Sequence, residues 1–329
     1  MKKILDHLFE YKALSKEQSK EVLTGIAKGD YNTSQIAAFL TIYAMRSVTV
    51  AELEGFRDAM LELCLAVDLA DYDPMDVCGT GGDGKDTFNI STLSCFVVAG
   101  AGQRVAKHGN HGVSSTCGSS TVLEYLGVKF SNEQDYLERA IAETGVCFLH
   151  APLFHPAMKN VAPVRQELGV KTFFNMLGPM TNPAFPQKQL AGVFSLELAR
   201  LYAYLYQQTD KKFMVVHGLD GYDEVSLTGS FKIITPQAEQ VLTPAQLGLD
   251  TFRAEALAGG ETVTESARIF MNVLNDEATS AQKQAVVANA ALALHAADSS
   301  LSLIDAVAKA MESIESKKAL ESFQKLVQL

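Results

Sequence analysis

Apolar positions in the first seventy residues recur every three or four places, the spacing of amphipathic helices and not of strands. The clearest stripe, which we expect to be buried, consists of Ile36, Phe39, Leu40 and Tyr43. The pattern predicts that residues 1–70 form a small all-helical domain.

Helix ends are marked in the same region. Ser15 is followed three positions later by Gln18, the spacing of a capping box in which both side chains bond free backbone amides of the first turn. Thr49 and Glu52 repeat this spacing. Gly29 suits a helix C-terminus because glycine adopts the left-handed conformation readily.

After Pro74, short apolar runs of strand length alternate with longer helical segments. Strands are expected just before the glycine-rich stretch 79–84 and within 103–110, 145–151, 190–195 and 211–218. Helices are expected over 90–102, 120–126 and 135–144 and from about 281 onward. A further helical segment is expected next to each of the last two strands. This alternation predicts an α/β fold, with a mainly parallel central sheet flanked by helices.

A proline-broken helical stretch near 155–169 interrupts the alternation, and we expect it to rejoin the N-terminal helices. The predicted division is therefore a helical domain of residues 1–70, joined by a return segment of about 157–182, and an α/β domain of residues 71–329.

Polar loops are predicted beyond the carboxyl ends of three strands, where open α/β sheets bind ligands. They lie at Gly79, at Lys107 and at 218–224. We expect the three loops to converge on one crevice.

The composition narrows the choice of partners. The 329 residues are 47% hydrophobic, enough for a large core, and the net charge of −10 disfavours nucleic acid and anionic membranes. The five cysteines form no C-x-x-C pair and are expected to be reduced core thiols. With no apolar signal-peptide core and no apolar run of membrane-spanning length, a cytoplasmic protein is expected.

Four glycines lie in GTGGDGKD, residues 79–86. A nucleotide-binding P-loop has Ser or Thr where Asp86 stands, and this carboxylate would repel phosphates, so ATP or GTP binding is disfavoured. The glycines are suited instead to turning backbone amides toward another anion, and Asn89, Ser91 and Thr92 add donors at the start of the next helix. An ordinary tight turn is the alternative.

The stretch AKHGNHGVSS, residues 106–115, gathers donor side chains in a predicted loop, namely Lys107, His108, Asn110 and His111. With Lys85 and Arg104 it forms a basic island in an acidic protein. Such a density of donors favours a phosphate or carboxylate ligand, with a solvated loop as the alternative.

Asp223 and Glu224 follow a predicted strand with no basic residue nearby in the sequence, which suits a hard cation such as Mg²⁺. Such a pair is also common in solvated turns. Taken alone, Arg165 fits an ion-pair partner and His155 a capping or core histidine. Together these patterns predict an enzyme that binds a phosphorylated, Mg²⁺-associated small molecule.

Six motifs, in this order, resemble the anthranilate phosphoribosyltransferase family over nearly the whole chain. They are GTGGD at 79–83, NIST at 89–92, KHGN at 107–110, HPAMKNVAPVR at 155–165, NMLGP at 175–179 and VVHGLDGYDE at 215–224. Each motif is short, but six at matching separations are specific.

The resemblance implies a fold like that of nucleoside phosphorylases and class III phosphoribosyltransferases, and a homodimer formed through the helical domain. It implies transfer of the 5-phosphoribosyl group from phosphoribosyl diphosphate to the amino group of anthranilate, in tryptophan biosynthesis. The products would be N-(5-phosphoribosyl)anthranilate and pyrophosphate.

The resemblance also implies roles for individual residues. Phosphoribosyl diphosphate would be bound by Gly79, Gly82, Asp83, Thr87, Asn89, Ile90, Ser91, Thr92, Lys107, His108, Gly109, Asn110, His111, Gly112, Val113, Ser114, Ser115 and Ser119. Anthranilate would be bound by Gly79, Asn110, His155, Arg165 and Pro179, and Mg²⁺ by Ser91, Asp223 and Glu224. The aniline nitrogen is nucleophilic at neutral pH, so no strong acid or base is assigned. Positioning would fall to Lys107, His108, Asn110 and Arg165.

Two positions depart from the family pattern. His111 stands where many members have arginine, which predicts a weaker or pH-sensitive phosphate contact. His150 stands where the family usually has an aromatic residue, which alters the nearby wall but not the reaction.

Two other functions are open to a chain of this kind. A pyrimidine nucleoside phosphorylase shares the fold and the glycine-rich loop but uses inorganic phosphate, and the Asp223–Glu224 pair, with Asn110 and Arg165, disfavours it. A non-catalytic relative that binds nucleic acid would need a basic face and would have lost motif residues, and this acidic chain retains them.

Overall fold

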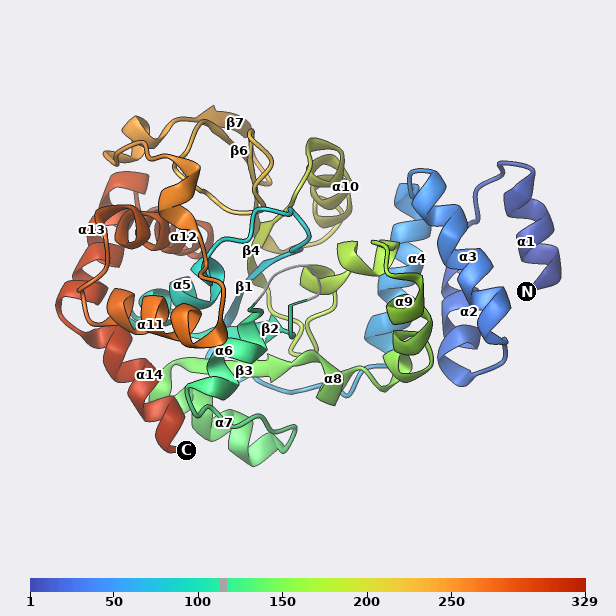
Figure 1. The fold of residues 1–329 in the computed structure, drawn as a ribbon, viewed down its shortest axis with the longest axis horizontal. Helices are drawn as coiled ribbons and strands as arrows, with labels where there is room; N and C mark the ends of the chain where they lie inside the picture. Colours follow the sequence, from blue (N-terminus) through green and yellow to red (C-terminus); the bar gives the residue numbers. More distant parts are fainter. Residues whose placement is uncertain (113–116) are drawn as a thin grey trace.

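The structure, a computed structural model, describes residues 1–112 and 117–329. Over these residues a small helical part lies beside a larger α/β part (Figure 1). The N-terminus lies in the helical part and the C-terminus in the α/β part.

Residues 1–70, predicted to be helical, contain four α-helices. They are α1 (Lys2–Phe9), α2 (Lys16–Lys28), α3 (Thr33–Met45) and α4 (Val50–Glu62). Both predicted capping boxes are present at the starts of α2 and α4, and Gly29 ends α2 in the left-handed conformation with φ of 81°. The stripe of apolar residues on α3 is buried, as its spacing predicts.

One sheet forms from the strands in the described ranges, which are β1 (Met75–Gly79), β2 (Val105–Gly109), β3 (Val146–His150), β4 (Lys188–Gly192), β5 (Lys212–Gly218), β6 (Phe231–Ile234) and β7 (Glu239–Leu242). The strand order is β3-β2-β1-β4-β5-β6-β7. The first five strands in this order are parallel, and β6 and β7 are antiparallel at one edge. The prediction of a mainly parallel sheet is confirmed, whereas the antiparallel edge was not predicted because three of the four β7 residues are polar or exposed.

Helices cover both faces of the sheet. Those that follow β1 in the α/β part are α5 (Ile90–Gly100), α6 (Ser119–Tyr125), α7 (Gln134–Thr144), α8 (Ala151–Phe154), α10 (Leu196–Tyr206), α11 (Val263–Leu274), α12 (Ser280–Ala297), α13 (Leu303–Glu315) and α14 (Lys318–Gln328). Short 3-10 turns precede β1, at Ala70–Tyr72, and lie between β7 and α11, at Pro244–Leu247 and Ala254–Leu257. Of these helices, the short α8 and the longer α11 were not predicted.

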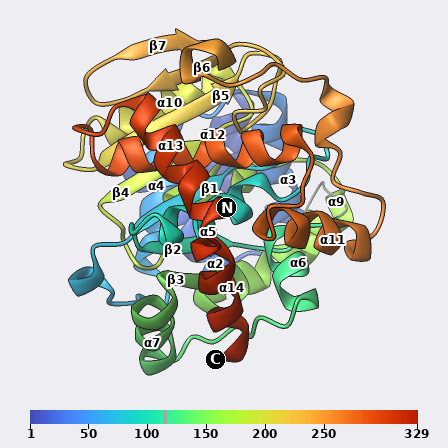
Figure 2. The same cartoon turned by 90° about the vertical axis from the view of Figure 1, so that its left-hand side faces the viewer.

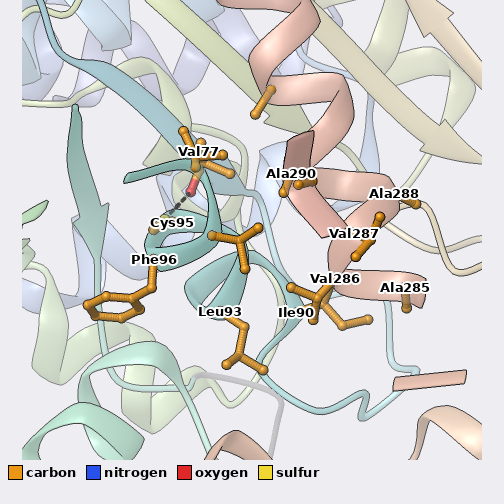
Figure 3. Packing of buried hydrophobic residues seen from close by; sticks show 14 of the residues in the cluster. Val77, Ile90, Leu93, Cys95, Phe96, Ala285, Val286, Val287, Ala288 and Ala290 are labelled. Atoms are coloured by element: carbon orange, nitrogen blue, oxygen red, sulfur yellow. Dashed lines mark hydrogen bonds between the residues drawn. The ribbon is translucent and has the colours of Figure 1, made fainter. Parts of the chain in front are cut away.

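The two faces of the sheet belong to different cores. Met214 and Val216 of β5 pack with α5 and α11–α14, and Phe213 and Val215 of the same strand pack with α10 and the helical part. This follows from the alternation of side chains along a strand. Figure 2 looks toward the first face and shows α11 to α14 in front of the strands, and Figure 3 shows α5 packed against α12.

The chain returns to the helical part after β3. This return segment contains η2 (Pro156–Asn160), α9 (Ala162–Leu168), η3 (Phe173–Met176) and η4 (Gly178–Met180). Phe173 stacks on Phe56 of α4 with ring centroids 4.2 Å apart, and Val161 and Val164 share the same core. The return segment therefore packs against the N-terminal helices while its ends join strands of the sheet.

The basic residues near β2 do not form the island predicted from the sequence. Lys107 and His108 lie within β2 and are buried, not in a loop. Arg104 precedes β2, at the other end of the strand from Gly109, and its guanidinium lies over the ring of Tyr72. Local pattern did not distinguish strand from loop here because a polar pair interrupts the apolar run.

The helices and the cysteines can also be compared with what the sequence predicts. Of the helices in the described ranges, none combines the length and apolarity needed to cross a membrane. All five cysteines are free, and all are buried except the half-buried Cys64, so the expectation of unpaired core thiols is confirmed for four of them.

Candidate active site

A cleft of about 290 Å³ opens beyond the carboxyl ends of β1 and β2. The glycine-rich loop, the start of α5, the end of β2, the loop after β5 and the return segment all contribute to its walls. The predicted convergence of three strand ends on one crevice is therefore confirmed.

Most residues predicted to bind phosphoribosyl diphosphate line this cleft. The described ones all do so except Ile90, which is fully buried in the core at the start of α5. Val113, Ser114 and Ser115 lie outside the described residues.

The glycine-rich loop begins where β1 ends. Gly81, Gly82 and Gly84 have φ values of 63°, 76° and 72°, a conformation that other residues adopt only at a cost. The amide of Gly81 donates to Asp223 Oδ2 at 2.6 Å, so this amide is already occupied. A methyl group on Gly79 would lie 2.5 Å from the same carboxylate oxygen, so a larger residue there would displace the Asp223 side chain.

The start of α5 connects the loop to two other parts of the site. Asn89 precedes the helix but makes no side-chain capping bond, and its amide donates to the Cys117 carbonyl at 2.9 Å. The amide of Ser91 donates to Glu224 Oε1 at 2.9 Å. These polar residues therefore hold neighbouring loops together, which a cap alone would not require.

Lys107 brings a buried positive charge to the floor of the cleft. Its Nζ donates to the Val77 carbonyl at 2.6 Å and lies 3.4 Å from Ser91 Oγ. Burial opposes this charge, but neighbouring groups that include Asp76 and Glu224 raise the pKa of Lys107 above its usual value. The lysine is therefore a cation at neutral pH.

Asp223 and Glu224 are buried beside the cleft. Burial and the charge of Asp83 raise the pKa of Asp223 to about 7, and burial and the charge of Asp223 raise the pKa of Glu224 well above its usual value. The sequence suggested that no basic residue lies near this pair, but Lys107 faces Glu224 across the fold.

The oxygen donors here suit a hard cation. Crowded carboxylates with raised pKa values are stabilised in their charged form by a divalent ion, and Mg²⁺ takes a few protein oxygens together with water and ligand oxygens. Ser91, Asp223 and Glu224 all line the cleft. Among the described residues no three His, Cys, Asp or Glu side chains are placed so that they alone could hold a metal ion, so a bound phosphate would have to supply further oxygens.

Arg165 of α9 faces the cleft from the return segment. It is mostly buried, its guanidinium lies 5.2 Å from the centre of the Phe174 ring, and Nη2 donates to Asn175 Oδ1 at 3.4 Å. Burial lowers the pKa of Arg165, which leaves the side chain charged because the usual value is so high. A planar cation in this setting suits a carboxylate ligand.

His108 and His155 lie together under this end of the cleft, with ring centroids 5.1 Å apart. Burial lowers their pKa values to about 3 and about 4, so both rings are neutral. His108 Nδ1 donates to the Gly178 carbonyl at 3.0 Å, which leaves Nε2 as an acceptor, and Nε2 has no partner among the described residues.

The five residues predicted to bind anthranilate divide into two groups. Gly79, Asn110 and Arg165 line the cleft, whereas His155 and Pro179 lie behind its surface and support it. The carbonyl of Pro179 accepts a hydrogen bond from Gln189 in the core.

His111 and His150, the two departures from the family pattern, touch one another. Their ring centroids are 5.0 Å apart, His111 Nδ1 lies 3.2 Å from Thr121 Oγ1, and His150 stacks on Phe130. Burial, and then the proximity of His111, lowers the pKa of His150. His111 lines the cleft, so the wall here is made of imidazole.

Several residues of the site were not among those predicted from the sequence. Phe174 and Asn175 line the cleft beside Arg165, and Lys171 donates a hydrogen bond to the Gly82 carbonyl. Asn175 begins the NMLGP motif, which could have indicated it, but the contact of Lys171 joins segments 89 residues apart.

Comparisons with known proteins agree with this geometry. Two family models match the chain, "Glycosyl transferase family, a/b domain" over residues 71–320 and "Glycosyl transferase family, helical bundle domain" over residues 2–64. The chain is 58% identical over 327 residues to the anthranilate phosphoribosyltransferase of Cytophaga hutchinsonii, covering 99% of this chain and all of that one.

Solved structures are similar over almost the full length. The crystal structure of anthranilate phosphoribosyltransferase from Thermus thermophilus matches with a TM-score of 0.91 and 36% identity, covering 98% of each chain. The Saccharomyces cerevisiae enzyme in complex with PRPP and Mg matches with a TM-score of 0.88 and 28% identity, covering 96% of this chain and 93% of that one.

Proposed function

The chain belongs to the anthranilate phosphoribosyltransferase family, and we propose that the cleft beyond β1 and β2 is where it carries out the family reaction. The enzyme transfers the 5-phosphoribosyl group of phosphoribosyl diphosphate to the amino nitrogen of anthranilate in tryptophan biosynthesis. The observation that carries the proposed site is the presence of a glycine-rich loop, a buried lysine and two carboxylates on one side of a single cleft, with Arg165 on the other.

The diphosphate end of the substrate would lie against the glycine-rich loop. The bond from C1 of the ribose to the diphosphate breaks as the aniline nitrogen approaches, so negative charge grows on the departing group and positive charge on C1. Fixed donors that face the departing group lower the barrier. The amides of Gly82 and Asp83 and the ammonium of Lys107 would be these donors.

Ser91, Asp223 and Glu224 would hold Mg²⁺ together with diphosphate oxygens. Bound there, the ion would neutralise the leaving group and the carboxylates alike. Magnesium is present in the structure of the yeast relative with PRPP, and the oxygen donors of this chain fit the same ion.

Anthranilate would lie at the Arg165 end. Arg165 and Asn110 would bind its carboxylate, which orients the amino group toward C1. The neutral ring of His108 lines this end of the cleft. Because the nucleophile is already uncharged at neutral pH, such positioning suffices, and a strong base is not needed.

The two parts of the molecule would act as separate domains, residues 1–70 with the return segment 157–182 on one side and the rest of 71–329 on the other. Arg165 belongs to the first and the glycine-rich loop to the second, so closure of the cleft would bring the substrates together. We propose that the protein forms a homodimer through the helical domain, where Phe9, Tyr11 and Met45 are exposed. We also propose that it is cytoplasmic, which agrees with its free cysteines.

One assay tests the proposal directly. The protein is mixed with anthranilate, phosphoribosyl diphosphate and Mg²⁺, and the loss of anthranilate fluorescence is followed together with pyrophosphate release. We expect both signals in equal amounts and none without the metal. Thymidine with inorganic phosphate serves as the control, and phosphorolysis of thymidine would instead support a nucleoside phosphorylase.

A further inference from the structure

Lys171, which lies outside every motif recognised in the sequence, contacts the glycine-rich loop from the return segment. Its Nζ donates to the carbonyl of Gly82, and its ammonium lies 5.7 Å from the centre of the Phe194 ring. We infer that Lys171 is a positioning residue, which turns the peptide between Gly82 and Asp83 so that the Asp83 amide faces the diphosphate. This inference rests on the proposed function of the cleft.

The planarity of the peptide bond fixes the directions of its carbonyl and amide relative to one another. In a trans peptide the carbonyl of one residue and the amide of the next point in opposite directions. There is no cis peptide in the described ranges. When Lys171 holds the Gly82 carbonyl on one side, the Asp83 amide must therefore point to the other.

The position of Lys171 indicates which side of the Gly82–Asp83 peptide faces the cleft. The described residues that line the cleft include Gly82 and Asp83 but not Lys171. This supports a contact with the carbonyl from outside the cleft and, in our inference, an Asp83 amide that faces into it. The reverse orientation would aim a carbonyl oxygen at the phosphate oxygens.

Glycine makes such a constraint necessary. Gly81 and Gly82 both have positive φ, and glycine exchanges between positive and negative φ at little cost, so the peptide can turn over unless something holds it. The preceding part of the loop is held by the bond from the Gly81 amide to Asp223. Lys171 fixes the next part of the loop in the same way, through its hydrogen bond to the Gly82 carbonyl.

The local structure of the return segment directs Lys171 to this contact. Gly169 ends α9 in the left-handed conformation with φ of 64°, which turns the chain. The Thr172 amide then donates to Asn175 Oδ1 at 3.0 Å, and the same oxygen accepts from Arg165. One short segment thus carries Arg165 for anthranilate and Lys171 for the diphosphate loop, and it joins the two substrate sites.

Three variants separate orientation from simple charge. Lys171→Met removes the donor, Lys171→Gln keeps a neutral donor, and Lys171→Arg keeps a charged one. We expect Lys171→Met to raise the Kd and KM for phosphoribosyl diphosphate about fivefold, with the KM for anthranilate changed less than about twofold. Lys171→Arg should restore the affinity, and Lys171→Gln should restore most of it.

A matched control accounts for net charge. Lys159→Met removes an exposed lysine from η2 of the same segment, and it should bind phosphoribosyl diphosphate as the unaltered protein does. Thermal unfolding of all variants reports whether they fold. If Lys171→Met bound normally, if both substrates were weakened equally, or if Lys171→Gln were as impaired as Lys171→Met, the orienting role would be wrong.

A second readout does not depend on catalysis. Inorganic pyrophosphate with Mg²⁺ is added to ¹⁵N-labelled protein, and the amide resonance of Asp83 is followed. It should shift in the unaltered protein and in Lys171→Arg but much less in Lys171→Met, and equal shifts in all three would overturn the inference. Failure of the unaltered protein to form product from anthranilate would count against the proposed function alone, because this shift is measured without anthranilate.

Discussion

The carboxylate of Asp223 holds the amide of Gly81 at 2.6 Å across 142 positions of the chain. The same side chain lies beside Glu224 and is among the oxygens proposed for Mg²⁺. The glycine-rich loop and the metal site are therefore coupled through one carboxylate, and a change at Asp223 is expected to affect both.

Asp223→Asn separates these two roles. Asparagine keeps an oxygen that can accept from the Gly81 amide but loses the charge that a hard cation prefers. We expect the variant to fold normally and to need about tenfold more Mg²⁺ for half-maximal activity. Asp220→Asn, an exposed acid in the same loop, is the control and should leave the Mg²⁺ titration unchanged. An unchanged titration in Asp223→Asn would refute the metal assignment.

The loop after β5 packs closely on the sheet at Gly192 as well as at Gly79. A methyl group at Gly192 would lie 1.8 Å from the backbone oxygen of Asp223, and backbone on both sides leaves little room for movement. Gly192→Ala is therefore expected to lower the free energy of unfolding by about 1–3 kcal/mol, measured by denaturant titration. Gly178→Ala is the control, because a methyl group there meets no atom within 4 Å. Equal stability of the two variants would contradict this account.

Features set by neighbouring residues were predictable from the sequence. The capping boxes at Ser15 and Thr49, the buried stripe on α3 and the parallel strands all depend on local spacing, and the structure has them. The glycine-rich loop was predictable because so many glycines close together are typical of a loop with positive φ angles and rarely occur within a helix or strand.

Features set by contacts between distant segments were not predictable. Lys107 looked like a loop donor, but its burial within β2 depends on partners such as Val77 and Glu224 that only the folded chain brings near. Lys171 showed no signal because its partner Gly82 lies 89 residues away. The predicted place of Arg104 beside Lys107 is wrong because sequence distance does not tell which end of a strand faces the cleft.

Arg165 provides a test of the anthranilate end of the cleft. Replacing it with alanine removes the buried cation proposed to bind the substrate carboxylate, and a charge-assisted hydrogen bond of this kind is worth about 1.5–3 kcal/mol. We expect Arg165→Ala to raise the KM for anthranilate about 10- to 100-fold, while the Kd for phosphoribosyl diphosphate changes little. Arg165→Lys should recover only part of this loss, because lysine lacks the planar fork. Loss of both substrates to the same degree would exclude the assigned role.

The buried histidines predict how stability depends on pH. Burial lowers the pKa of His155 to about 4, whereas an unfolded histidine has a pKa of about 6.5. Between these values the unfolded chain binds a proton that the folded chain does not, so the free energy of unfolding falls as the pH drops from about 6.5 toward about 4. From about pH 7 to about pH 5 this one residue should remove about 2 kcal/mol.

His155→Phe isolates the contribution, because the ring is kept and the titrating group is removed. Whatever its stability at neutral pH, the variant should lose about 2 kcal/mol less than the unaltered protein when the pH is lowered to about 5, measured by urea unfolding at both values. His7→Gln, in a histidine of α1 away from the cleft, controls for the loss of any histidine and should follow the unaltered protein. His108, buried against His155 with its own pKa lowered to about 3, should give a similar difference when replaced. If His155→Phe lost as much stability as the unaltered protein, the ring of His155 would have to be charged or exposed in solution, and the neutral buried state assigned to it would be wrong.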